Sequence, residues 1–267
     1  MLRQLFKPIT LALSTDGIAM RVAGHMPKML TNAPSKLVTN EALLDAFTQA
    51  LQDADLQKSG KNIRLIVSNH FLRYSVLPWQ PEIVSREDWV AIAQHDFRKR
   101  YGTVAERWKI CVSLNGFGSN IVASALDESL FEGLNNIAQE HGCKLIAIEP
   151  FLMSVFKQYQ SNAGQQWLLI AEPERVLLCE MAGNQLQRFS VISPPQQQEV
   201  EQALLLVQRS LQSVEPEKRP TDILYCSAPL LSSTGSAEWR GEKIALKPWP
   251  ISVATHQRSA ALWMAGF

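Results

Sequence analysis

The stretches LALSTDGIAMRVA (Leu11 to Ala23) and LLIAEPERVLLCEMAGNQL (Leu168 to Leu186) share one pattern. Each begins with an apolar run typical of a buried strand, passes through a tight turn with an acidic residue, and continues as a second apolar strand. Each is followed, some tens of residues later, by an amphipathic segment with helical spacing, at about 40–55 in the first half and 196–214 in the second. The repeat predicts two α/β halves, each opened by a β-hairpin.

The chain between the two hairpins alternates between strand-like and helix-like segments. Ser85 is predicted to cap a helix, with Asp88 three positions later as in a capping box. Two strands are expected at Trp108–Leu114 and Asn120–Leu126, joined by a glycine-containing turn, and Asp127 caps the next helix. This alternation favours α/β architecture with mixed sheets.

The second half repeats this order after the polar segment Gln160–Gln166, which is the best candidate for a domain boundary. A meander of three strands is expected over 167–192 and a further strand at Asp222–Cys226, whereas Ser227–Lys247 is poorly patterned. The predicted domains are therefore 1–163, with an inserted subdomain at about 84–126, and 164–267, with a short C-terminal helix at His256–Gly266 that packs back on the first domain.

The composition is that of an ordinary globular protein. Of 267 residues, 46% are hydrophobic and 19% charged, and the formal net charge of +1 argues against nucleic-acid binding. The four cysteines are widely spaced and show no zinc-binding pattern, so no metal site is predicted. No run approaches the roughly 20 apolar residues that span a bilayer. We expect a cytoplasmic protein.

A loop that binds phosphate needs converging backbone N–H groups, and these require glycine. The first turn offers Asp16 and a single glycine, Gly17. Asp16 in a turn ordinarily bonds its own backbone. The second turn places Glu172 and Glu174 around Pro173, which removes one donor and adds negative charge.

The strand at Asp222–Cys226 is the third position at which a nucleotide would approach the backbone. It continues into Ser227, Ala228 and Pro229 and contains no glycine. All three positions therefore lack the residues that nucleotide binding needs.

The segment RYSVLPW (Arg73 to Trp79) combines a basic residue with two aromatic ones at a strand end. Such aromatic residues either pack against the core or form a binding surface, because Trp and Tyr contribute disproportionately to interface energy. Arg73, Tyr74, Trp79 and the first strand of the inserted block are the candidates for contact with a partner.

The order of these elements resembles the actin-like (ribonuclease H-like) ATPase-fold proteins of bacterial type IV pilus and type II secretion assembly, such as PilM and the cytoplasmic part of GspL. Asp16, Gly17 and Arg21 correspond to the Asp-x-Gly loop of that family in altered spacing, and Glu172–Pro173 replaces the second loop. The block at about 84–126 resembles the family's extra subdomain, and SAALWMAG (Ser259 to Gly266) its final helix.

The resemblance implies a cytoplasmic scaffold, peripheral to the inner membrane, that docks a short peptide of an inner-membrane assembly protein. Because all three nucleotide loops depart from the family pattern, we expect a pseudo-ATPase without a cofactor. Whether the pathway is a pilus or a secretion system, and whether the protein forms a homo-oligomer, stays open.

Two other interpretations stay open as well. In an active magnesium-dependent ATPase or kinase, Asp16 would coordinate magnesium through water and Glu172 would position the nucleophile. Asp16, Gly17 and Ser227 would then contact ATP. In the other interpretation, the chain is an α/β domain unrelated to actin.

Overall fold

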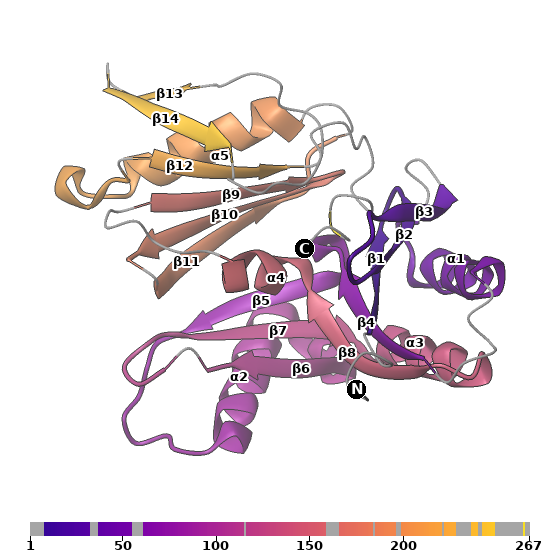
Figure 1. Ribbon diagram of the computed structural model, residues 1–267. Helices are drawn as coiled ribbons and strands as arrows, with labels where there is room; N and C mark the ends of the chain where they lie inside the picture. Colours follow the sequence, from indigo (N-terminus) through magenta and orange to yellow (C-terminus); the bar gives the residue numbers. More distant parts are fainter. Residues whose placement is uncertain are drawn as a thin grey trace. The chain divides into compact units, whose positions relative to one another are not determined.

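The computed structural model describes residues 8–32, 37–54, 61–114, 116–158, 166–183, 185–195, 199–220, 222–227, 236–239, 242–248 and 264. The chain divides into two compact units, shown in Figure 1. The first holds the described residues of Met1–Leu72, Leu126–Gln158 and Ser252–Phe267, and the second those of Arg73–Ala125 and Tyr159–Ile251.

A five-stranded mixed sheet in the order β3-β2-β1-β4-β8 forms the first unit. Its strands are β1 (Ile9–Ser14), β2 (Gly17–Val22), β3 (Lys28–Asn32), β4 (Asn62–Val67) and β8 (Lys144–Pro150). β1 is antiparallel to β2, as the first hairpin predicts, and parallel to β4, which in turn is parallel to β8. Every residue of the central β1 is buried, as expected for a strand covered on both faces.

The helices of the first unit are α1 (Asn40–Asp53), α3 (Glu128–Glu140) and α4 (Phe151–Gln158). Asp127 caps α3 as predicted, accepting a hydrogen bond from the N–H of Ser129 at 2.9 Å. The cap of α1 is Thr39, whose Oγ1 accepts from the N–H of Ala42. The apolar face of α1 is buried as its spacing predicts, and it packs against α3.

The second unit contains a three-stranded sheet in the order β5-β7-β6. Its elements are β5 (Leu72–Leu77), α2 (Arg86–Tyr101), a 3-10 helix (Gly102–Arg107), β6 (Trp108–Ser113) and β7 (Ile121–Asp127). A further 3-10 helix, Asn69–Phe71, precedes β5 and belongs to the first unit. Ser85 caps α2 as predicted. Trp89, Ala93 and Phe97 of α2 are buried in the core of this subdomain.

A six-stranded sheet in the order β11-β10-β9-β12-β14-β13 forms the rest of the second unit. Its elements are β9 (Gln166–Glu172), β10 (Arg175–Ala182), β11 (Gln185–Ile192), α5 (Glu199–Gln212), a 3-10 helix (Pro216–Lys218), β12 (Asp222–Ser227), β13 (Ser236–Trp239) and β14 (Glu242–Pro248). The predicted meander is present, with β12 parallel to β9. β13 and β14 lie in the segment that showed no pattern. The predicted C-terminal helix lies outside the described residues apart from Met264, which is helical and buried.

Candidate functional site

The turn between β1 and β2 is the first predicted phosphate position. Ser14 ends β1 and pairs with Gly17, the first residue of β2. Gly17 has a φ of +151°, and a Cβ atom there would lie 2.3 Å from the carbonyl oxygen of Thr31 on the neighbouring β3. The sheet by itself therefore requires glycine at position 17, and this glycine is no sign of a ligand.

Two buried hydroxyl groups lie beside this turn. Ser14 and Thr15 are at most 1% exposed, and within the described residues neither side-chain oxygen has a hydrogen-bond partner. The carbonyl oxygen of Thr15 accepts a hydrogen bond from the N–H of Leu37 at 3.2 Å. Asp16, between the two strands, is partly exposed. The turn thus presents hydroxyls and a carboxylate where a phosphate-binding loop needs several converging N–H donors.

A helix N-terminus near the ends of β1 and β4 is satisfied by the protein itself. The Asn69 side-chain oxygen accepts a hydrogen bond from the N–H of Leu152, in the first turn of α4, at 3.0 Å. The N–H of Ser68 donates to the carbonyl oxygen of Leu13 at 2.9 Å. Asn69 therefore holds a donor of α4 that an anion would otherwise bind.

Glu149, near the end of β8, is a buried carboxylate that the sequence analysis missed. Its oxygens pair with Arg64 at 2.6 Å and with Lys157 at 2.8 Å, and Ser154 donates a hydrogen bond at 3.0 Å. Burial would raise the pKa of Glu149, but Lys157 and Arg64 together outweigh it and hold the pKa below its usual value. A lone acidic residue at the end of an apolar strand was its only signal. The network joins β4, β8 and α4, so its role is structural.

The turn between β9 and β10 is the second predicted phosphate position. Glu172 ends β9 and is only 2% exposed. In the strand register it lies opposite Arg175 at the start of β10. Pro173 has no N–H to donate. Glu174 has a φ of +59°, in the left-handed region that glycine adopts most easily. This turn therefore has the backbone shape of a glycine turn but carries carboxylates and lacks one donor.

The carboxylate of Glu172 belongs to a partly buried cluster of polar and charged side chains in the second unit. Burial raises the pKa of Tyr74 on β5, and Glu172 raises it further against the opposing effect of Arg175. The pKa of Arg175 is lowered by burial and by the nearby Arg73. Burial and Glu172 also raise the pKa of the Cys226 thiol on β12. Glu172 thus faces the protein's own side chains.

The three residues predicted to contact a partner differ in exposure. Tyr74 is 5% exposed, and its ring meets that of Phe189 on β11 at 5.5 Å. Arg73 and Trp79 are partly exposed. Trp79 packs against the buried Trp89 and against the exposed Phe117. Of the three, only Arg73 and Trp79 have side chains that reach the surface of this unit.

Ser227, the third predicted nucleotide contact, is the last residue of β12 and pairs with Ala171 of β9. Its side chain, with Ala228 and Pro229, lies outside the described residues. Asp16 belongs to the first unit and Glu172 to the second.

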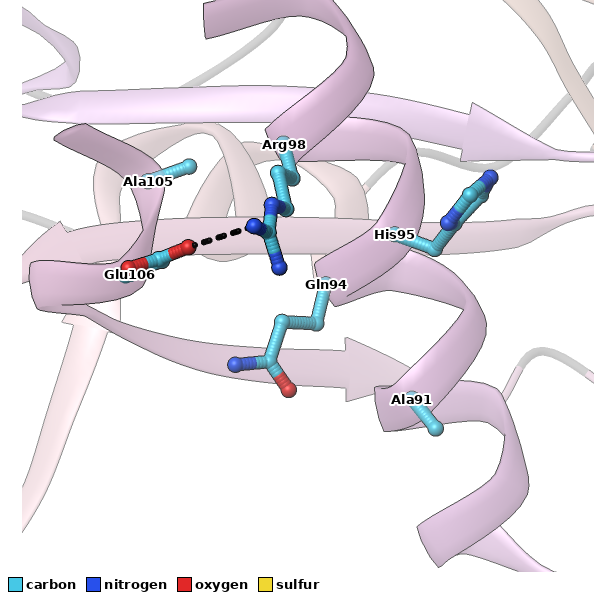
Figure 2. A pocket seen from close by; sticks show the side chains of 6 residues that line it. All are labelled: Ala91, Gln94, His95, Arg98, Ala105 and Glu106. Atoms are coloured by element: carbon cyan, nitrogen blue, oxygen red, sulfur yellow. Dashed lines mark ion pairs between the residues drawn. The ribbon is translucent and has the colours of Figure 1, made fainter. Parts of the chain in front are cut away.

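A pocket of about 230 Å³ lies on the inserted subdomain, and none of the predicted site residues lines it. Figure 2 shows that it is lined by one face of α2 and the adjacent 3-10 helix. Arg98 and Glu106, which line it, form an ion pair at 3.1 Å with both side chains well exposed. Its charges are already paired, so it is no candidate for the functional site.

Neither a metal centre nor a membrane span emerges from the described ranges. No three His, Cys, Asp or Glu side chains there are grouped so that they could hold a metal ion. No helix in the same part of the chain is long and apolar enough to cross a membrane.

No protein-family model and no curated protein matches the sequence. Solved structures do resemble the fold. Cyto-EpsL, the cytoplasmic domain of an inner-membrane component of the type II secretion system of Vibrio cholerae, is 11% identical at a TM-score of 0.54, and the match covers 87% of each chain. A protein of unknown function with an actin-like ATPase fold, from Bacteroides thetaiotaomicron, is 12% identical at a TM-score of 0.57 over 86% of this chain and 85% of that one.

The PilM–PilN type IV pilus biogenesis complex matches at 12% identity and a TM-score of 0.48, over 79% of this chain and 67% of that chain. The fold assignment rests on the first two structures. They confirm the predicted actin-like ATPase fold for this chain. The interpretation as an α/β domain with a fold other than the actin-like one is therefore wrong.

Proposed function

We propose that this protein is a non-catalytic, cytoplasmic binding module of a secretion or pilus assembly platform, and that it docks a segment of an inner-membrane partner. Its likeness in fold to the cytoplasmic domain of EpsL supports this class of function. The observation that carries the non-catalytic part is the β9–β10 turn, where Glu172 is buried beside Tyr74 and Arg175.

The residues at the two turns do not fit a nucleoside triphosphate. A polyphosphate at the β9–β10 turn would meet the carboxylates of Glu172 and Glu174, and like charges repel strongly where water is excluded. Pro173 supplies no donor. At the β1–β2 turn the single glycine is required by the close approach of β3. The residue types of the two turns are not those of a loop in which converging N–H groups hold phosphate.

The alternative is an active ATPase or kinase of the same fold, and one observation favours it. Ser14 and Thr15 carry buried hydroxyls with no partner within the described residues, beside the partly exposed Asp16. Buried polar groups are ordinarily hydrogen-bonded. A bound ligand at this turn would satisfy them.

Calorimetric titration of the full chain with ATP and magnesium separates the two functions. The proposal expects no heat of binding at millimolar nucleotide. A micromolar site that is lost in Asp16→Ala would contradict it and favour the ATPase. Glu180→Gln removes a buried carboxylate toward the end of β10 that is farther from the β9–β10 turn than Glu172 is, and it is the matched control for a general effect of removing a charge.

The binding function is tested by affinity capture from detergent-solubilised membranes of the organism that produces the protein. The proposal expects one membrane protein to be retained and its capture to fall in Arg73→Ala and Trp79→Ala. Tyr74→Ala reports on packing as well, because that side chain is buried, so its folding must be checked by circular dichroism. Absence of any membrane partner would count against the function.

A further inference from the structure

One end of the subdomain built on the three-stranded sheet β5-β7-β6 carries four exposed or partly exposed apolar side chains, those of Trp79, Val84, Leu114 and Phe117. We call it the apolar tip. Val84 is 90% exposed, Phe117 89% and Leu114 50%. The four residues come from the connections between β5 and α2 and between β6 and β7, and the ring contact between Trp79 and Phe117 brings the two connections together. Figure 1 shows both connections at the same end of the three-stranded sheet.

Ring contacts and a turn hydrogen bond hold Phe117 of the apolar tip in place. The ring of Phe117 meets that of Trp79 edge-on at a centroid distance of 5.2 Å, and Trp79 lies 5.9 Å from the fully buried Trp89 of α2. The turn that carries Phe117 is closed by a hydrogen bond from the N–H of Ser119 to the carbonyl oxygen of Gly116 at 3.3 Å. A large aromatic ring held this way at nearly full exposure resembles the preorganised anchors of protein interfaces.

The border of the apolar tip is acidic. Residues 82–88 carry three carboxylates, Glu82, Glu87 and Asp88, against one cation, Arg86, which gives a net charge of −2. Arg86 donates a hydrogen bond to the carbonyl oxygen of Val112 at 3.1 Å, so part of its guanidinium is engaged by the protein. Glu82 and Glu87 are exposed. This charge opposes an anionic lipid surface and complements a basic one.

We propose that the apolar tip docks a short segment of the partner in which large apolar side chains are flanked by Lys or Arg. The apolar side chains pack against Phe117 and Val84, and the basic residues face Glu82 and Glu87. This inference rests on the proposed function and specifies the partner. Cytoplasmic segments next to membrane spans are rich in Lys and Arg, so a tail of an inner-membrane protein has this chemistry.

A pair of labelled peptides tests the chemistry by fluorescence anisotropy with the full chain. Both contain Leu-Phe-Leu, flanked by Lys in one peptide and by Glu in the other. The Lys peptide should bind and the Glu peptide should not, and binding of the Lys peptide should weaken as salt increases. Equal binding of the two peptides, or no binding of the Lys peptide, would overturn the proposal.

Substitutions test the location. The affinity for the Lys peptide should fall roughly tenfold or more in each of three variants. These are Phe117→Ser, Val84→Ser and the double variant Glu82→Lys with Glu87→Lys. Met26→Ser and Glu132→Lys, at exposed positions in the first unit, are the matched controls and should change nothing. The altered side chains are exposed, so circular dichroism should show unchanged folding. Full binding by Phe117→Ser would place the site elsewhere.

Three further readouts separate this inference from its rivals and from the proposed function. Binding to phosphatidylglycerol vesicles that depends on Phe117 would show that the apolar tip binds lipid and would overturn the peptide proposal. Dimerisation in light scattering that depends on Phe117 would show that the tip binds a second copy of the chain and would overturn it as well. Capture of the membrane partner that is equal in Phe117→Ser and wild type would refute the apolar tip and leave the proposed function standing. If the Lys peptide binds at the tip but no membrane partner is captured, the apolar tip would stand as a binding site and the proposed function would be refuted.

Discussion

Gly17 illustrates how one residue type can serve two different needs. In a phosphate loop glycine lets the backbone approach a ligand, whereas here it lets β2 approach β3, because a Cβ atom would contact the Thr31 carbonyl oxygen. The sequence shows the glycine but cannot separate these causes. The Asp-Gly pair was therefore predictable as a turn, and the reason for its glycine was not.

Gly17→Ala is expected to destabilise the protein. Both Gly17 and Gly24 have positive φ, but a Cβ atom on Gly24 would meet nothing within 4 Å. Gly24→Ala should therefore cost only the backbone strain of about 1–2 kcal/mol, and Gly17→Ala about 1–3 kcal/mol more from the clash. Urea denaturation of the two variants measures the difference. Equal free energies of unfolding would show that β3 moves aside at no cost.

Glu149 is expected to make stability depend on acid pH. Its pKa is held below the usual value in the folded protein, so its contribution is present above the ordinary glutamate pKa of about 4.3 and is lost as pH falls through the folded-state pKa. Glu149→Gln should cost about 1.5–3 kcal/mol at pH 6, and the cost should fall as pH falls through the folded-state pKa. Chemical denaturation across this range gives the curve for each variant.

Glu180 on β10 is a control, because its effect on stability should change with pH in the opposite direction to that of Glu149. Burial raises its pKa more than Arg188 lowers it. Its contribution is therefore fully present below the unfolded pKa and is lost as pH rises through the folded pKa. Glu180→Gln should gain stability relative to wild type as pH increases from 3 to 6, whereas Glu149→Gln should lose it. Parallel curves for the two variants would contradict both assignments.

Among whole elements, the hairpins and the helices flanked by capping residues could be predicted because their signals are local. Ser85 and Asp127 cap their helices as the sequence indicates. β13 and β14 could not, because β13 is an edge strand and an edge strand needs few apolar residues to pair. Their segments, SAEW and EKIALKP, mix charged and apolar residues and resemble a loop.

Substitutions at Glu174 test whether the backbone of the β9–β10 turn is strained by a residue other than glycine. Glu174 occupies a backbone conformation that glycine adopts without strain. Glu174→Gly should therefore stabilise the protein by about 0.5–1 kcal/mol, and Glu174→Val should cost about 1 kcal/mol or more because β-branched residues resist positive φ. Thermal denaturation orders the three proteins as Gly, Glu, Val. A Val variant as stable as the Gly variant would exclude strain at this position.

Across the whole chain, residues that are distant in sequence become neighbours. Tyr74 lies near Glu172 and Phe189, and no pattern local to RYSVLPW indicates that its ring is buried there. Aromatic content predicted a packing or binding role without choosing between them. Phe117 was interpreted only as part of a hairpin turn, because exposure is a property of the folded chain. The fold was thus more predictable than its surface.

The contacts of the inserted subdomain predict that it opens together with the sheet of the second unit. The Asn120 side chain donates hydrogen bonds to the Leu186 carbonyl oxygen at 3.0 Å and to Gln187 at 3.4 Å, and the Tyr74 ring meets Phe189 on the same strand. Asn120→Ala removes the donor and leaves the Leu186 carbonyl without this bond. Loss of one hydrogen bond should cost about 1 kcal/mol and speed opening of both partners.

Native-state hydrogen exchange measures this coupling, because amides that open in one cooperative unit change protection together. In Asn120→Ala, amides of β7 and β11 should exchange about fivefold faster, with those of β1 and β2 in the first unit unchanged. Asn135→Ala, which removes a hydrogen bond within α3, is the matched control and should act only on the first unit. Faster exchange in β7 alone would mean that the subdomain opens independently. The inserted block would then be a separate folding unit. Binding at the apolar tip would then not affect the opening of the six-stranded sheet.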